Sequence, residues 1–292
     1  MDAMELRPLS TGEILDRTFT LYRRNFLLFL GISAIPQVLV LILNLLRVSV
    51  TLPSLGLSGA ARTSHAAPAF PSMGGIVTGA VIGLVVLVVS VIAYLLSQGG
   101  TVAAVSELYL GRTITIVESF RRVSGELLNL LGVVMLNGLA TFAAFLCFFI
   151  PGFYVISRLL VCVPAAIVEN IGPRDSLERS WALTKDNAGR AFVILLLYFA
   201  VSIAAAALFA WPFTIGMVLV ARKDPSQTVL WLQLTQVGTF VASVLVTPIL
   251  TIASAILYYD LRVRKEAFDI QVMMNPADKS APAPGALPTM FS

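Results

Sequence analysis

Charged residues are scarce in this chain of 292 residues. Asp, Glu, Lys and Arg together make up only 12% of it, whereas 58% of the residues are hydrophobic. Soluble domains carry about 25% charged residues, so a surface this poor in charge could not face water on all sides. The composition excludes a disordered chain, a disulfide scaffold and a nucleic-acid-binding protein, and it predicts an integral membrane protein.

Histidine and cysteine are almost absent. The single histidine, His65, lies among Pro, Ser, Gly and Ala residues, where we expect a solvated side chain rather than a ligand or a base. Both cysteines, Cys147 and Cys162, fall in apolar runs, and we expect small buried side chains rather than a disulfide. The chain also lacks a Walker-type loop, a nucleophile elbow and an HExxH motif. We therefore expect no metal, no cofactor and no enzymatic activity.

Long uncharged runs predict six transmembrane helices. About 20 apolar residues cross a bilayer core of roughly 30 Å, because a helix rises 1.5 Å per residue. One run, 127–168, is too long for a single span, and the Pro151-Gly152 pair within it predicts the turn of a helical hairpin. The predicted spans are 26–46, 74–106, 127–150, 153–169, 191–221 and 226–259.

Lys and Arg gather on one side of these spans. With six spans both termini share a side, and most of the basic residues fall on that side. The opposite side carries only Arg47, Arg62, Arg222 and Lys223. This bias predicts cytoplasmic termini. We expect residues 1–274 to form a single membrane domain and the Pro-rich residues 275–292 to form a disordered tail.

A short motif recurs before the first, third and fifth predicted spans. It reads LDRTFTLYRRN over 15–25 and LERSWALTKDN over 177–187, with a weaker copy, IVESFRRVSGEL, over 116–127. Each copy is amphipathic at helical spacing, which predicts a helix lying in the cytoplasmic interface. The repeat positions of interest are Arg17, Phe19, Asn25, Phe120, Arg179, Trp181 and Asn187.

The fold class that follows is all-α: a polytopic membrane protein with six transmembrane helices in three hairpin repeats. Each repeat begins with a cytoplasmic amphipathic interfacial helix, and the repeats cover residues 10–111, 112–173 and 174–266. Hairpins that share an orientation imply parallel repeats related by an axis along the membrane normal.

Four segments of the chain resemble the bacterial glycerophosphodiester phosphodiesterase membrane-domain-like proteins. The segments are RPLSTGEILDRTFTLYRRNF at 7–26, RLLVCVPAAIVE at 158–169, SLERSWALTKDN at 176–187 and YYDLRVRKEAFD at 258–269. This family takes its name from a membrane module that is sometimes fused to a hydrolase, and its shared motifs carry no catalytic signature. The resemblance implies a multi-pass protein of the bacterial plasma membrane, without the hydrolase domain.

Arg158 is the one charge predicted to lie within a span. It falls about six residues into the fourth span, roughly 9 Å below the outer boundary by helical rise. A charge at such a depth is costly. The interpretation we favour is a side chain that snorkels outward or pairs with a loop or carbonyl group near the external surface. The alternative is a headgroup, anion or substrate contact.

Three acids, Glu107, Glu169 and Asp260, end the even-numbered spans at the cytoplasmic boundary. One interpretation is that they bind interfacial arginines and clamp each hairpin to an interfacial helix. The other is a ring of carboxylates at the mouth of a cation pathway. The arginines considered for the clamp are Arg17, Arg112, Arg174 and Arg179.

Aromatic, glycine and proline residues complete the set. Phe19 and Trp181 are expected to anchor the chain at the interface rather than to bind a ligand. The run Gly75, Gly79 and Gly83 predicts close packing against a neighbouring helix, with dimerisation as the second interpretation. Kinks are predicted inside four spans at Pro36, Pro164, Pro212 and Pro248.

Two functional hypotheses fit these features. The first is a non-enzymatic membrane protein that organises the membrane or binds lipids and partners at the inner face. The second is a transporter or channel for a small solute, ion or lipid. The expected partners are the bilayer with its anionic lipid headgroups, and a second copy of the chain or a membrane partner protein. No nucleic acid is expected.

Overall fold

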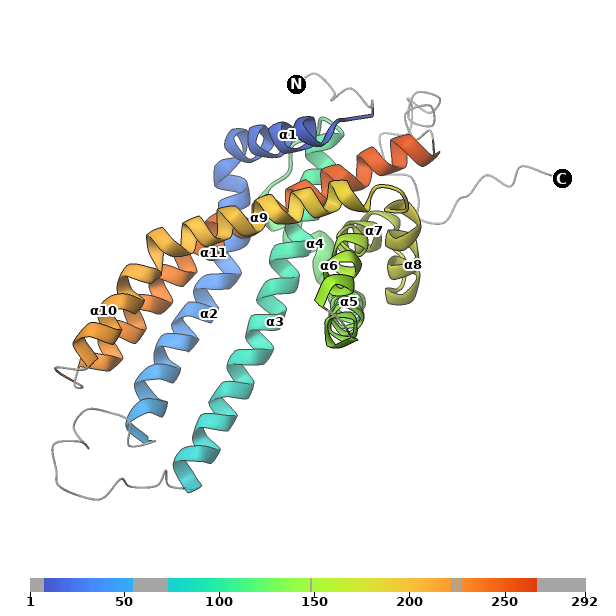
Figure 1. Cartoon of the computed structure of the whole chain (residues 1–292). Helices are drawn as coiled ribbons and strands as arrows, with labels where there is room; N and C mark the ends of the chain where they lie inside the picture. Colours follow the sequence, from blue (N-terminus) through green and yellow to red (C-terminus); the bar gives the residue numbers. More distant parts are fainter. Residues whose placement is uncertain (1–7, 55–72, 148, 222–223, 225–226, 267–292) are drawn as a thin grey trace. The chain divides into compact units, whose positions relative to one another are not determined.

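The computed structural model describes residues 8–54, 73–147, 149–221, 224 and 227–266, and the regular structure in these ranges is entirely helical. The predicted all-α class is confirmed (Figure 1). The helices are α1 (Thr11–Arg24), α2 (Phe26–Ser54), α3 (Met73–Tyr109), α4 (Ile116–Ser124), α5 (Leu127–Cys147), α6 (Phe149–Arg158), α7 (Cys162–Glu169), α8 (Pro173–Leu183), α9 (Ala188–Phe209), α10 (Trp211–Ala221) and α11 (Thr228–Glu266).

Six apolar helical segments are long enough to cross a membrane. They are Phe26–Thr51, Met73–Tyr109, Leu127–Cys147, Ile150–Glu169, Ala188–Phe209 and Thr228–Glu266. They coincide with the six runs selected from the sequence, so the chain is a multi-pass membrane protein. Two segments exceed the roughly 20 residues that a span needs, since α3 has 37 residues and α11 has 39.

Prolines begin helices in this protein more often than they bend them. Pro151 and Gly152 lie in the first turn of α6 rather than in a turn between two spans, so the predicted hairpin turn was misplaced. Pro164 and Pro212 likewise occupy the first turns of α7 and α10, where a missing N–H costs nothing. The fourth span is therefore broken between α6 and α7, and the fifth between α9 and α10. Pro36 and Pro248 do lie inside helices.

The chain divides into two compact units that cut across the three predicted repeats. Among the described residues, unit 1 comprises 8–32, 95–147, 149–197 and 248–266, and unit 2 comprises 33–54, 73–94, 198–221, 224 and 227–247. Helices α2, α3, α9 and α11 contribute residues to both units.

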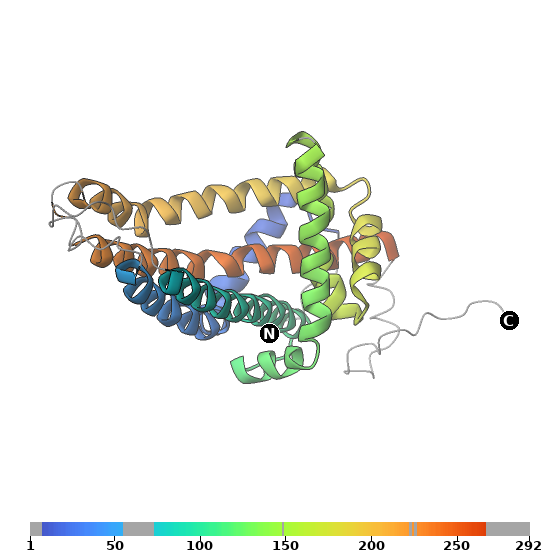
Figure 2. The ribbon, with the colours of Figure 1, turned by 90° about the horizontal axis from the view of Figure 1, so that it is seen from below.

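Unit 1 is built around the C-terminal half of α11. Residues 252–261 of this helix are all buried, and apolar residues of α1, α3, α7, α8 and α9 join them in one hydrophobic core. Within that core the rings of Tyr109 and Tyr259 stack, with their centroids 4.9 Å apart. Within this unit, α5 runs at a steep angle to the C-terminal half of α11 (Figure 2).

Three of the short helices in unit 1, α1, α4 and α8, each precede a long apolar helix. Helix α1 begins with a capping box of Ser10 and Glu13, and α4 begins with the same arrangement of Thr115 and Glu118. Helix α8 has no side-chain cap and begins instead at Pro173 after Gly172.

Unit 2 packs through a few close helix approaches and leaves most of its large apolar side chains exposed. A Cβ atom on Gly238 of α11 would overlap the Phe209 carbonyl group, and one on Gly216 of α10 would overlap the Trp231 ring. The predicted glycine run behaves differently. A Cβ on Gly79 would make only an ordinary contact with Thr51, and one on Gly83 would meet no atom within 4 Å. Within the described chain, close packing at Gly79 and Gly83 is therefore a wrong prediction.

Candidate functional site

Glu107, at the end of α3, is held by two arginines. Its side chain pairs with Arg122 of α4, and Arg112 Nη1 lies 3.5 Å from its second oxygen. Gly111, with φ of +76°, allows the chain to turn directly after α3 and place Arg112 next to the acid. This carboxylate therefore joins the end of α3 to the following short helix.

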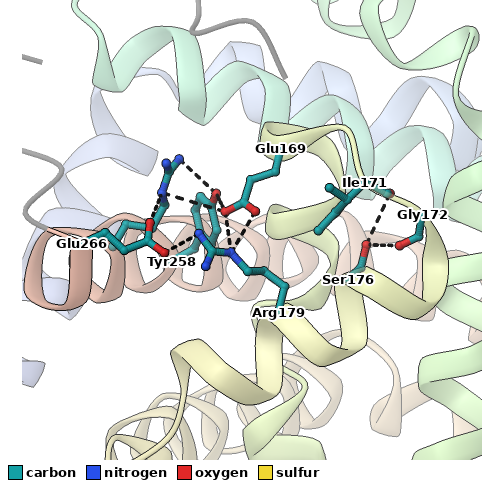
Figure 3. A network of polar contacts seen from close by, with 8 residues as sticks. Glu169, Ile171, Gly172, Ser176, Arg179, Tyr258 and Glu266 are labelled. Atoms are coloured by element: carbon teal, nitrogen blue, oxygen red, sulfur yellow. Dashed lines mark hydrogen bonds and ion pairs between the residues drawn. The ribbon is translucent and has the colours of Figure 1, made fainter. Parts of the chain in front are cut away.

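Glu169, at the end of α7, lies at the centre of a larger network (Figure 3). Arg179 Nε of α8 donates to both of its oxygens, at 2.9 and 2.8 Å, and the Tyr258 hydroxyl donates to it at 2.7 Å. Arg179 also pairs with Glu266 at 2.5 Å, and Arg262 lies 3.1 Å from the same acid. The network joins α7 and α8 to the C-terminal end of α11.

Asp260 is the most deeply buried of the three acids, with its side chain fully covered. It pairs with Arg190 of α9 at 2.8 Å and with Arg264 at 3.0 Å. The backbone of Leu9 completes the cluster, because its N–H donates to Asp260 and its carbonyl oxygen accepts from both arginines. The segment before α1 is thereby fixed to the end of α11.

Arginine pairing also determines the electrostatics of these networks. Burial alone would lower the pKa of Arg179, but the neighbouring Glu169 and Glu266 carboxylates outweigh it and raise the pKa. The expected ion pairs of Glu107 with Arg112 and of Glu169 with Arg179 are present. Of the other two arginines considered, Arg17 hydrogen-bonds Tyr109, and Arg174 pairs with Glu178 on the surface of α8.

Arg158 ends α6 and is only 5% exposed. Its Nη2 donates to the Trp181 carbonyl oxygen at 2.7 Å, and its guanidinium carbon lies 4.5 Å from the Trp181 ring centroid and 5.6 Å from that of Tyr154. The hydroxyl groups of Ser180 and Thr184 donate to the Arg158 carbonyl oxygen at 2.8 and 2.9 Å. Residues of α8 and its C-cap therefore provide a hydrogen-bond partner for a backbone carbonyl at the C-terminal end of α6, and Trp181 holds the guanidinium of Arg158 in place.

These contacts conflict with the expected positions of Arg158 and Trp181. The sequence placed it near the outer boundary and placed Trp181 on the cytoplasmic side, yet the two residues are in contact, so both placements cannot hold. A depth calculated from helical rise assumes one continuous helix. Residues 153–158 do form one continuous helix in α6, so the contact with Trp181 means that at least one of the two placements is wrong without deciding which.

An open pocket of about 640 Å³ adjoins Arg158. It is lined by Tyr154, Arg158, Trp181, Ala182, Lys185, Asp186, Ala188 and Gly189, which come from α6, the end of α8, the following turn and the start of α9. Arg158 Nε is buried there without a hydrogen-bond partner among the described residues. This pocket combines two cations, two aromatic rings and the first residues of a long helix.

The remaining repeat positions do not share a role. Phe19 is 37% exposed on α1, whereas Phe120 of α4 packs against the core of unit 1. Asn25 follows α1 and donates to the Leu21 carbonyl oxygen, whereas Asn187 accepts from Arg190 in the turn before α9. Residues at equivalent positions of the repeat thus have different surroundings.

Sequence reasoning missed several partners. Arg190, Arg264 and Tyr258 hold the acids, and Lys185 and Gly189 line the pocket. Tyr258, Arg264 and Lys185 lie in the segments quoted above, but no role was assigned to them, and Arg190 and Gly189 lie outside those segments. In the part of the chain that the structure describes, no group of three or more His, Cys, Asp or Glu side chains could hold a metal ion.

Comparison with known proteins gives no match, since no protein-family model fits this chain and no curated protein or solved structure is similar to it.

Proposed function

We propose that this multi-pass membrane protein is a non-enzymatic module that binds anionic lipid headgroups through α1, α4 and α8. These helices would lie in the cytoplasmic interface, each ahead of one hairpin. Both termini would face the cytoplasm of a bacterial cell, as the resemblance to the phosphodiesterase membrane-domain family implies. A second copy of the chain or a membrane partner protein would assemble on the same module.

One observation carries the proposal: α1 and α4 each present an exposed apolar side chain four residues before an exposed cation, and α8 presents one four residues before an exposed cation in the turn that follows it. The apolar residues are Phe19, Val117 and Trp181, at 37%, 74% and 42% exposure. The cations four positions later are Arg23, Arg121 and Lys185. Residues four apart are neighbours on a helix surface, so the pairs on α1 and α4 can each insert the apolar member and direct the cation to a headgroup phosphate.

These cations differ from the arginines of the acid networks because their charges are not neutralised. The side chains of Arg23, Arg24, Arg121 and Lys185 make no hydrogen bond or ion pair with another described residue. A basic side chain close to an anionic leaflet contributes about 1 kcal/mol. Three free arginines are therefore worth about a hundredfold in lipid affinity.

Retention of lipid tests this proposal directly. The purified full chain is mixed with phosphatidylglycerol or phosphatidylcholine, and native mass spectrometry measures the affinity for each lipid. The triple variant Arg23→Gln, Arg24→Gln and Arg121→Gln should lose about a hundredfold in affinity for phosphatidylglycerol and little for phosphatidylcholine. A matched control is the double variant Arg174→Gln and Glu178→Gln, which removes an exposed ion pair from α8 without changing the net charge. Equal retention of both lipids by the native chain would contradict the proposal.

Transport is the second candidate function, and Arg158 together with the interior prolines Pro36 and Pro248 favours it. The hypothesis of a carboxylate ring at the mouth of a cation pathway is not supported, because Glu107, Glu169 and Asp260 are each paired with arginines. Flux of ions or lipid in proteoliposomes that contain the native chain, absent from empty vesicles, would favour this candidate.

A further inference from the structure

The pocket next to Arg158 has the chemistry of an anion site. Arg158 is 95% covered and its guanidinium uses Nη2 on the Trp181 carbonyl group, while the buried Nε has no partner among the described residues. The side chain lines the pocket, and its Nη1, which makes no hydrogen bond with a described residue, can donate to an oxyanion there. A guanidinium held against the Trp181 ring is already oriented for such a ligand.

Two further positive groups line the same pocket. Lys185 is exposed, and its ammonium makes no contact with another described residue. Ala188 and Gly189 are the first residues of α9, a helix of 22 residues, and their N–H groups have no backbone partner in the described chain. Free N–H groups and the helix dipole make such an N-terminus attractive to anions. Arginine, lysine and helix N-terminus thus meet in one place.

We infer that this pocket binds a phosphate group, with Arg158, Lys185 and the N-terminus of α9 as its donors. The inference rests on the proposed function for one source of that group, an anionic lipid headgroup. The other source is free phosphate. The exposed edges of Tyr154 and Trp181 favour the headgroup, because these two side chains prefer the level of the membrane–water interface.

Asp186 is the one acid in the lining, and it supplies a sharp test. It is exposed and has φ of +69°, a left-handed conformation that Asn also tolerates. Asp186→Asn removes a negative charge from the pocket at no conformational cost. Phosphate affinity should rise about twofold to fivefold, the magnitude of an exposed charge interaction. Affinity that stays level or falls would contradict the proposed site.

The main experiment titrates the purified full chain in neutral detergent with inorganic phosphate and with dihexanoyl phosphatidylglycerol, using isothermal titration calorimetry. Lys185→Gln should raise both dissociation constants about tenfold, and Gly189→Glu should raise them further by placing a negative charge in the pocket. A Cβ atom at Gly189 meets no other atom within 4 Å, so this variant is expected to fold. Gly125→Glu is the matched control, since Gly125 is equally open but ends α4.

The two ligands distinguish the two sources. A dissociation constant at least tenfold lower for the lipid supports a headgroup site, and equal or tighter binding of inorganic phosphate supports a site for free phosphate. Absence of binding by both ligands, or binding that Lys185→Gln and Gly189→Glu leave unchanged, overturns the inference. That failure would not remove the proposed function, which depends on lipid retention through Arg23, Arg24 and Arg121. Conversely, phosphate binding without selective lipid retention would remove the proposed function alone.

Discussion

The two compact units of this protein are held together by different forces. Unit 1 encloses the C-terminal half of α11 in a hydrophobic core and closes it with buried ion pairs around Glu107, Glu169 and Asp260. Unit 2 leaves residues such as Leu87 and Ile35 more than half exposed, and its helices meet at glycines such as Gly238. Apolar side chains gain nothing by leaving hydrocarbon, so helices in lipid rely on close packing at small residues. Unit 1 therefore adds a hydrophobic core and ion pairs to its helices, although it also contains the exposed apolar helix α5, whereas unit 2 depends more on close packing at small residues.

The strongest way to break unit 1 is to remove its fully covered acid. Asp260→Ala leaves the partly buried Arg190 and the exposed Arg264 without their carboxylate and frees the Leu9 N–H. Loss of one partner of a buried ion pair costs about 3–5 kcal/mol. The midpoint temperature of thermal unfolding in detergent should therefore fall strongly. The control in unit 2 is Gln233→Ala, which removes an exposed hydrogen bond to Ser49 and should cost about 1 kcal/mol or less. Equal shifts for the two variants would abolish the contrast between the units.

A charge placed on unit 2 tests whether its surface faces lipid. Leu87, in α3, is 60% exposed, and Leu87→Lys should disfavour membrane insertion by about 2.5–3.5 kcal/mol. The matched variant in unit 1 is Val117→Lys on α4, where the side chain is 74% exposed and the cost should be small. A glycosylation-based insertion assay measures both. If Leu87→Lys inserts as well as Val117→Lys, the exposed apolar surface of unit 2 does not lie in hydrocarbon.

Close packing in unit 2 can be tested with a pair of glycines. Gly238→Ala forces α11 away from the Phe209 carbonyl group and should destabilise the protein by about 1–3 kcal/mol. Gly83→Ala meets open space and should be neutral or stabilising by up to about 1 kcal/mol, because Ala favours helix. Denaturation in mixed micelles gives the difference, and the opposite ranking would mean that the glycine run of α3 carries the packing.

The smallest expected effect concerns an exposed acid of unit 1. Glu118 accepts hydrogen bonds from the Thr115 N–H and hydroxyl groups, and these bonds lower its pKa below the ordinary 4.5. Its stabilising contribution to α4 is therefore present above pH 4.5 and is lost as the pH falls through the lowered pKa. Hydrogen exchange of the α4 amides should accelerate modestly, beyond its intrinsic pH dependence, between pH 6 and pH 3. Glu118→Gln should remove that extra dependence, and a persistent one would assign it to another group.

Much of the fold could be predicted because its signals are local. Uninterrupted apolar runs located the six helices. The ends of the helices were harder to predict than their presence. Pro151-Gly152 is a turn signal in short-range statistics, yet here Pro151 occupies the first turn of α6, a position equally suited to proline. Local sequence could not distinguish these two uses.

The candidate site was only partly accessible to such reasoning. Arg158 was conspicuous as a lone charge in an apolar run, but its contact with the Trp181 carbonyl group joins residues 23 positions apart and could not be read from the run. Lys185 was part of the repeat but had no assigned role, and Gly189 lies outside it; both line the pocket beside residues of α6. The pairing of Asp260 with Arg190 joins residues 70 positions apart, which no spacing rule predicts.

Composition and hydrophobic run length were enough to establish a multi-pass, all-α membrane protein, since both properties act through local chain geometry and the cost of burying charge. Tertiary structure decided which charges neutralise one another and which stay free. It buried Asp260 among arginines from distant helices, left Arg23 and Lys185 unpaired, and placed Arg158 against Trp181. Electrostatic interactions depend on distance in space, and that distance is set only when helices far apart in the sequence pack together.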